Sequence, residues 1–283
     1  MGKVKIFTDS TADLSKELLE KYNISVVPLY VILNEKSYRD GLDLTTIEMY
    51  ELIEKYQTLP KTSAPTVEDF KAAFLPWLQQ NYEIVYIGIS SGFSGTVQAA
   101  TIAAKELGEE KVHIVDSLNL SMGIGLLAIE AAEMAQQGME GAMIAKKVRE
   151  DVPKVRSSFF IDTLKFLHMG GRCTSVQMLA STVLRIRPQI IVRDGGMIVG
   201  SKYRGNRKRC LESFYQDHIG EGKEIRLNRI SVTHSACPPE EVAYLKEKIK
   251  KELQIEEVLE TRAGTVISSH CGPQTIGVLY IQD

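Results

Sequence analysis

Strand-like and helix-like segments alternate regularly through the first half of the chain. Apolar and β-branched runs such as KVKIFTD, EIVYIGI and KVHIVDS are each followed by a segment whose apolar residues recur at helical spacing. Strands that are joined by helical crossovers pair in parallel within one sheet. The pattern therefore predicts an α/β fold for this half, a Rossmann-like layer around a largely parallel sheet.

The second half has a different pattern, in which strands follow one another more directly. RPQIIVRDGGMIVGSKYR places two apolar runs around Asp194, Gly195 and Gly196, which are residues typical of a hairpin turn. With 283 residues, the chain is long enough for two domains. We expect residues 1–155 to form the N-terminal α/β domain and residues 156–283 to form a C-terminal α+β domain.

Composition and charge argue against several classes of function. The formal net charge is -2, and the basic run SKYRGNRKRC has few aromatic neighbours, so nucleic acid is not an expected partner. No apolar run approaches the roughly 20 residues of a membrane span. The N-terminal MGKVKIFTDS begins a strand pattern and not a leader peptide. The cysteines lie far apart, which argues against a zinc site or disulfide framework and favours a cytoplasmic location.

GISSGFSGT, residues 88–96, joins a predicted strand to an Ala-rich predicted helix. The start of a helix offers free backbone N–H groups and a partial positive charge, which together favour an anion. Gly92 and Gly95 allow backbone to approach a ligand closely. Ser94, Gly95 and Thr96 are therefore candidates for binding a carboxylate or a phosphate.

Two other interpretations of this loop remain open. Its first five residues match the G-x-S-x-G pattern of a hydrolase nucleophile, so Ser90 or Ser94 could attack a substrate. Asp116 and His270 follow in the order that such a triad needs, but no histidine–carboxylate pairing can be identified from the sequence. Alternatively, Ser94 or Thr96 only caps the helix.

Hydroxyl side chains also cluster in other predicted loops. LPKTSAPT offers Thr62 and Ser63 in addition to Thr66, which is the expected helix N-cap. Asp9, in TDSTADL, is interpreted as a ligand contact or as a residue that stabilises its own turn. No P-loop lysine is present, so these neutral donors suit a carboxylate better than a nucleoside triphosphate. His270 is predicted to lie in a tight Gly-Pro loop that faces the first domain.

The order and spacing of several segments resemble the DegV family of bacterial fatty-acid-binding proteins. The segments are IFTDSTADL, KTSAPT, SSGFSGTVQAA, LKFLHMGGR, KYRGNRK and HCGPQTIG. Two positions depart from the family pattern: Val97 stands where tyrosine is common, and Gln274 stands where glycine is typical. The resemblance implies two domains with a fatty acid buried in a tunnel between them. Some members of the family are the acyl-carrying subunit of a fatty acid kinase, in which a separate ATP-binding subunit phosphorylates the carboxylate.

The resemblance also implies roles for individual residues. Thr62 and Ser94 are expected to donate hydrogen bonds to the carboxylate, His270 to complete this network, and Arg172 and Arg204 to contact the kinase subunit. Ser63, Gly95 and Thr96 complete the expected ligand-binding set. We expect no catalytic centre, metal or cofactor in the chain itself, and a non-catalytic lipid sensor is the alternative within the same class.

The energetics agree with such a ligand. A chain of about 16 carbons offers on the order of 10 kcal/mol at ~0.8 kcal/mol per buried CH₂, before the costs of ordering. Its carboxylate must still be satisfied, because burying an unpaired charge is costly. Two or three charge-assisted hydrogen bonds of roughly 1.5–3 kcal/mol each are therefore required.

Overall fold

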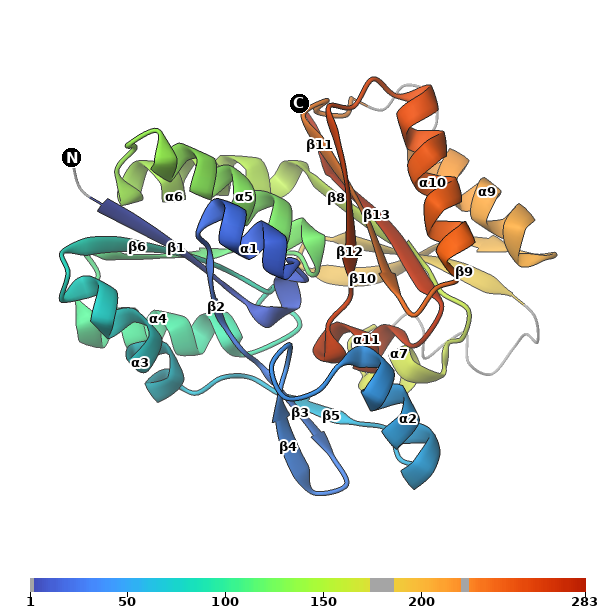
Figure 1. Cartoon of the computed structure of the whole chain (residues 1–283), viewed down its shortest axis with the longest axis horizontal. Helices are drawn as coiled ribbons and strands as arrows, with labels where there is room; N and C mark the ends of the chain where they lie inside the picture. The colour runs from blue at the N-terminus through green and yellow to red at the C-terminus, as the bar shows by residue number, and fades with distance from the viewer. Residues whose placement is uncertain (1–2, 174–185, 220–223) are drawn as a thin grey trace.

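The computed structural model describes residues 3–173, 186–219 and 224–283 and shows two lobes, each built on its own sheet (Figure 1). The N-terminal lobe has a four-stranded sheet in the order β2-β1-β6-β7. Its strands are β1 (Lys3–Asp9), β2 (Ser25–Val27), β6 (Tyr82–Gly88) and β7 (Val112–Asp116). Every neighbouring pair in this sheet is parallel, which confirms the predicted α/β layer.

Helices cover both faces of the parallel sheet (Figure 1). On one face lie α1 (Lys16–Tyr22), α5 (Met122–Gln136) and α6 (Gly141–Asp151), and on the other lie α3 (Val67–Leu78) and α4 (Thr96–Leu107). The α3 helix begins at Thr66 in a capping box with Asp69, as predicted. These layers bring the carboxyl ends of β1, β6 and β7, and the loops that follow them, to one edge of the sheet.

A small antiparallel sheet departs from the expectations. The apolar run ISVVPLYVIL is typical of one strand region, but it divides at Pro28 into β2 and β3 (Tyr30–Leu33). The β3 strand pairs with β4 (Lys36–Arg39) and with β5 (Lys61–Ser63). Thr62 and Ser63, expected in a loop, therefore lie in strand β5, because β3 supplies a pairing edge that local sequence does not reveal. The α2 helix (Thr46–Tyr56) precedes β5.

The first helix also differs from the prediction. The apolar spacing of STADLSKELLEKYN, residues 10–23, indicates one amphipathic helix, but the segment forms a 3₁₀ turn, η1 (Ser10–Ala12), followed by α1. Asp13 lies between them with φ 54°, in the left-handed region, which interrupts the helix. Ser15 then caps α1 through the Leu18 amide.

The C-terminal lobe has a six-stranded sheet in the order β10-β9-β8-β13-β11-β12. Its strands are β8 (Val155–Phe160), β9 (Arg187–Arg193), β10 (Gly196–Tyr203), β11 (Arg229–Ser235), β12 (Glu257–Arg262) and β13 (Thr275–Ile281). All pairs are antiparallel except β11 with β12. The predicted hairpin is confirmed as β9–β10, with Asp194 and Gly195 both at positive φ in its turn.

Four described helices accompany this sheet. The α9 helix (Arg207–Ile219) and α10 (Pro239–Glu252) lie along it, and α7 (Lys165–Gly170) and α11 (Thr265–Cys271) lie at its end near β3 and β5 (Figure 1). A short turn, η2 (Val152–Lys154), leads into β8. The change from one sheet to the other thus begins at Val155, while the domain boundary at residues 155 and 156 stays a prediction.

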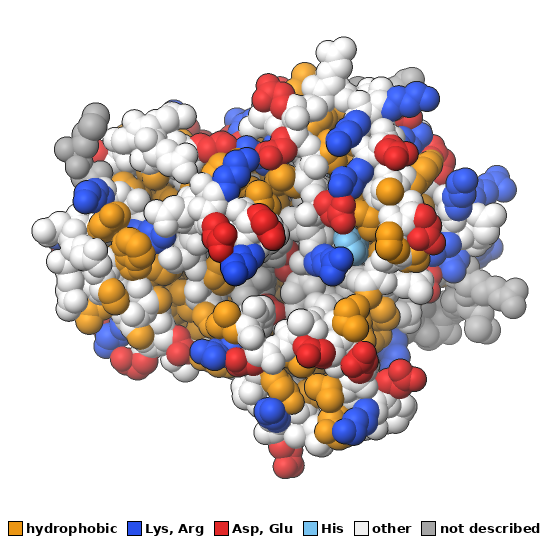
Figure 2. All heavy atoms as spheres, in the orientation of Figure 1, with side chains coloured by type: hydrophobic (Ala, Val, Ile, Leu, Met, Phe, Trp, Pro, Cys, Tyr) orange, Lys and Arg blue, Asp and Glu red, His pale blue; other side chains and the backbone are white. Residues whose placement is uncertain are grey.

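The two lobes share a continuous apolar core. One cluster of buried residues extends from Leu127 and Ile129 of α5 to Phe159 and Leu279 of the second sheet. On the visible face, Lys and Arg side chains are interspersed with Asp and Glu over both lobes (Figure 2). Within the described ranges, none of the helices combines the length and apolar character that crossing a lipid bilayer requires.

Candidate functional site

A cavity of about 490 Å³ opens where the carboxyl edge of the parallel sheet meets the C-terminal lobe. We call it the mouth cavity. Of the residues singled out in the sequence, those that line it are Thr62, Ser63, Gly92, Ser94, Gly95, Arg172 and His270. They come from β5, the loop before α4, the segment after α7, and α11. The structure therefore brings together residues that lie up to about 200 positions apart in the chain.

A second, narrow cavity of about 60 Å³ lies deeper between the lobes. We call it the deep cavity. It shares Leu120, Met197, Ile267 and His270 with the mouth cavity, so the two spaces adjoin. Its apolar walls also include Phe159, Leu167 and Leu279.

Hydroxyl groups around the deep cavity are already hydrogen bonded inside the protein. Ser121 donates to Asp13, Ser158 to the Ile190 carbonyl and Thr275 to the Cys271 carbonyl, while Thr233 bonds to Thr261 and Ser235 to Ser268. Because these groups have partners, what the deep cavity presents to a ligand is mainly apolar surface. The mouth and the deep cavity together match a molecule with one polar end and an apolar tail.

His270 was predicted in a tight loop, and this prediction is wrong. It lies in the last turn of α11, and the Gly-Pro turn follows it. Its Nε2 is 2.9 Å from Thr62 Oγ1, which joins the C-terminal lobe to β5. The helix forms because α11 packs against α7, α2 and β3, contacts that the short local sequence does not encode.

Burial governs the charge of His270. Desolvation, together with the nearby Arg172, lowers the pKa of His270 to about 4, so the imidazole is neutral near pH 7. Its buried Nδ1 has no hydrogen-bond partner among the described residues. A Cβ atom at Gly170 would overlap Nδ1, so glycine at this position leaves room for the ring.

The loop before α4 places its hydroxyls differently from a simple helix cap. Ser94 Oγ lies 2.7 Å from Thr96 Oγ1, while Gly95 occupies the N-cap and no side chain caps the helix. The capping interpretation of Ser94 and Thr96 is therefore wrong. Thr96 is fully buried behind Ser94 and does not line the mouth cavity. Ser94 is the hydroxyl of this pair that borders the cavity.

The geometry gives no support to a serine nucleophile. Ser90 is fully buried, and its Oγ donates to the Gly195 carbonyl at 2.7 Å. Asp116 accepts hydrogen bonds from the backbone amides of Ser91 and Leu118, and His270 contacts Thr62. Among the described residues, the hydrogen bonds of Ser90 and Ser94 thus go to groups other than histidine.

Asp9 stabilises the strand ends around it. The buried carboxylate accepts from the Thr11 amide and hydroxyl, from the Tyr86 hydroxyl at 2.7 Å and from the Ile89 amide at 2.9 Å. All of these donors belong to the protein, which confirms that Asp9 stabilises its own turn.

The two arginines of the expected docking surface lie in different surroundings. Arg172 is exposed at the rim of the mouth cavity and donates to the Gly170 carbonyl. Arg204 is also exposed but lines neither the mouth nor the deep cavity.

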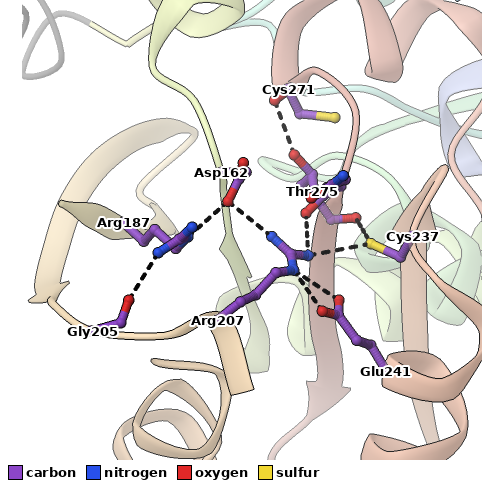
Figure 3. Close-up of polar contacts among 9 residues, drawn as sticks. Asp162, Arg187, Gly205, Arg207, Cys237, Glu241, Cys271 and Thr275 are labelled. Carbon is purple, nitrogen blue, oxygen red and sulfur yellow. Dashed lines mark hydrogen bonds and ion pairs between the residues drawn. The ribbon is translucent and has the colours of Figure 1, made fainter. Parts of the chain in front are cut away.

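The basic run SKYRGNRKRC, which contains Arg204, is only partly exposed to solvent. Arg207 points inward, and Figure 3 shows its guanidinium between Asp162 and Glu241. The same group donates to the Gln274 carbonyl at 2.7 Å, in the turn after α11. Gln274 has a φ of 59°, which lies in the left-handed region that glycine favours. Arg207 therefore holds a strained turn next to His270.

Several lining residues had no signal in the sequence. Met197 comes from the β9–β10 hairpin and Ile267 from α11, and both border the two cavities. Each belongs to an ordinary apolar pattern, so only the packing of the lobes identifies them.

Comparisons with known proteins agree with this architecture. The sequence profile of the DegV family, described as uncharacterised proteins, matches residues 3–283. A DegV domain-containing protein from Clostridium perfringens is 33% identical over 100% of both chains. A DegV family structure from Thermus thermophilus, described as binding fatty acid, superposes with a TM-score of 0.89 at 30% identity, over 99% of this chain and 100% of that one. A stearic acid-binding protein from Eubacterium ventriosum superposes with a TM-score of 0.86 at 29% identity, over 100% of this chain and 98% of that one. The match along nearly the whole chain establishes that this protein belongs to the DegV family.

Proposed function

We propose that this protein binds a long-chain fatty acid, with the carboxylate in the mouth cavity and the acyl chain running past Met197 and Ile267 into the apolar deep cavity, which must widen beyond its about 60 Å³ to hold the whole chain. The observation that carries this proposal is the junction at Met197, Ile267 and His270, where a space lined by hydroxyls adjoins an apolar one. The two solved relatives whose descriptions name fatty acid support the same class of ligand.

Neutral hydroxyls can hold the carboxylate through two short relays. If His270 Nε2–H donates to Thr62 Oγ, the Thr62 hydroxyl hydrogen is free to donate to the ligand. If the buried Thr96 hydroxyl donates to Ser94 Oγ, the Ser94 hydrogen is free in the same way. Both donors then point at one anion without an ion pair, and the carboxylate stays reactive toward a phosphoryl donor.

Mass spectrometry of organic extracts and binding of added palmitate and oleate test the proposal. A protein that carries no fatty acid and binds neither compound contradicts it. Thr62→Val, which keeps the shape of the side chain but removes the hydroxyl, should weaken binding about ten-fold or more, whereas Thr62→Ser should retain it. Ser94→Ala should weaken binding in the same way.

Ser63→Ala is the matched control for these variants. Ser63 also lines the mouth cavity, but alternate side chains of a strand point to opposite faces, and among the described residues its exposed Oγ donates to the Ala64 carbonyl at 3.3 Å. The Ser63 hydroxyl, although it was expected in the site, should therefore contribute less than that of Thr62. A fluorophosphonate adduct on Ser90 or Ser94 would instead favour the hydrolase.

We further infer that a separate ATP-binding kinase subunit phosphorylates the bound carboxylate in the cytoplasm. The exposed Arg172 at the mouth and the exposed Arg204 offer cationic contacts for such a partner. Arg204→Ala should leave palmitate binding unchanged but impair acyl phosphate formation with a kinase subunit from the same cell. A protein that binds fatty acid and supports no transfer with any such subunit is a lipid sensor.

A further inference from the structure

The α11 helix has no N-terminal cap of its own. Its N-cap residue, Gly264, carries no side chain, and its backbone has φ -64° and ψ 178°. The two amides at the start of the helix are instead satisfied by carboxylates of the N-terminal lobe. Gly264 N donates to Asp13 Oδ1 at 2.7 Å, and Thr265 N donates to Asp40 Oδ1 at 2.7 Å. The caps are therefore supplied from across the boundary between the lobes.

Both carboxylates are buried and held by further bonds. Asp13 is 5% exposed and accepts from Ser121 Oγ at 2.5 Å, and Asp40 is 2% exposed and accepts from the Thr265 hydroxyl at 2.7 Å. A Cβ atom at Gly264 would lie 2.9 Å from Asp40 Oδ1. The Asp40 carboxylate thus takes the space in which a serine or aspartate at the N-cap would place its own side chain.

This capping bears directly on the cavities. The α11 helix is only seven residues long, and so short a helix depends on its caps and packing. It carries Ile267 and His270, which border both cavities. A shift at the start of the helix therefore moves His270 relative to Thr62.

We propose that Asp13 and Asp40 are positioning residues, which dock α11 against the N-terminal lobe so that His270 reaches Thr62 and completes the carboxylate site. The part of this inference that concerns ligand affinity rests on the proposed function; the part that concerns His270 does not. Neither aspartate lines the mouth cavity or the deep cavity, and the lobes must be docked for the site to exist.

Four variants of Asp40 and Gly264 test this role. Asp40→Ala should weaken palmitate binding about five-fold or more, the equivalent of one lost N-cap. Asp40→Asn keeps an acceptor oxygen for Thr265 and should bind like the wild type. Asp40→Ala with Gly264→Ser supplies a cap within α11 itself, in the space that the carboxylate leaves, and should regain most of the affinity. Gly264→Ser alone meets the Asp40 carboxylate and should weaken binding.

The NMR titration of His270 in the unliganded protein is the second readout. In Asp40→Ala the pKa of His270 should rise from about 4 toward its ordinary value because the ring becomes more solvated, and Gly264→Ser should reverse this rise. Asp43→Ala is the matched control, because the exposed Asp43 carboxylate accepts its hydrogen bonds from Arg39 of the same turn, as far as the described residues show.

Two results would overturn the proposal. One is an Asp40→Ala variant in which both the palmitate affinity and the His270 titration match the wild type. The other is a double variant of Asp40→Ala with Gly264→Ser in which neither the palmitate affinity nor the His270 titration returns toward that of the wild type. Failure of the wild-type protein to bind palmitate would contradict the proposed function alone, because the His270 titration would still decide the positioning role.

Discussion

At the scale of single residues, His270 connects burial to function. A neutral imidazole can donate one hydrogen bond to Thr62 and does not form an ion pair with a bound carboxylate. Desolvation enforces this neutrality, because it holds the pKa of His270 at about 4. The residue types in the hydroxyl loops could be recognised from the sequence as carboxylate donors, but the neutral state of His270 could not, since it depends on burial by distant segments.

The depressed pKa of His270 predicts an acid-sensitive contribution to stability. In the unfolded chain, His270 has a pKa near 6.5 and binds a proton below about pH 6.5. In the folded protein the same residue binds this proton only as the pH approaches 4. The contribution is therefore fully present above pH 6.5 and is lost as the pH falls to 4, and it amounts to at most on the order of 3 kcal/mol. His270→Gln should flatten the dependence of unfolding free energy on pH in this window.

Urea unfolding at a series of pH values measures the effect. His168→Gln, which replaces an exposed histidine of α7, controls for the change of side chain itself. A His270 resonance that titrates near pH 6.5 in the folded protein would rule out this account.

At the scale of elements, the turn between α11 and β13 shows how the fold tolerates a residue other than glycine in a left-handed backbone conformation. Gln274 lies at φ 59°, where a residue with a Cβ atom is strained. Its amide donates to the Ser235 carbonyl at 2.7 Å, and its carbonyl accepts from Arg207. These two backbone hydrogen bonds hold Gln274 in the left-handed conformation that glycine would adopt with less strain.

Gln274→Gly should therefore stabilise the protein slightly. Relief of left-handed strain is worth roughly 1–2 kcal/mol, and the added freedom of glycine in the unfolded chain offsets about 0.5–1 kcal/mol of it. Gln274→Val should destabilise, because a β-branched residue tolerates this region least. Chemical denaturation measures the free energy of unfolding of both Gln274 variants and of the control Gln79→Gly. Because Gln79 has a helical φ of -63°, this control should lose about 0.5–1 kcal/mol of unfolding free energy. A Gln274→Gly variant less stable than that control would refute the strain argument.

At the scale of the whole molecule, the lobes are joined at two further places that lie away from α11. On one side, Arg226 binds Glu130 and Asp151, and Arg229 binds Glu133. On the other, the β9–β10 hairpin meets the loop before α4, where the Gly195 carbonyl accepts from Ser90. The cavities lie between two lobes that are fixed to each other, so ligand affinity depends on their docking.

A substitution at Gly92 tests how strongly the docking of the lobes depends on close packing. A Cβ atom at Gly92 would overlap the Gly195 carbonyl, which is backbone and cannot rotate away. Gly92→Ala should push the hairpin outward, lower the unfolding free energy by about 1–3 kcal/mol and weaken fatty acid binding through Met197. Gly95→Ala lies in the same loop with open space around its Cβ and should leave the melting temperature nearly unchanged. Equal melting temperatures for the two variants would contradict a tight contact between the lobes.

Local sequence determined the parallel sheet, the β9–β10 hairpin and the capping box at Thr66, because hydrophobic period, turn residues and caps act over a few neighbouring positions. It also identified Thr62, Ser94 and His270 as residues of interest. Only the tertiary structure decided that Thr62 lies in a strand and His270 in a helix. It also decided that Arg207 points inward and that Asp13 and Asp40 cap α11. Each of these depends on partners that lie tens to hundreds of residues away, and such contacts exist only once the lobes have packed.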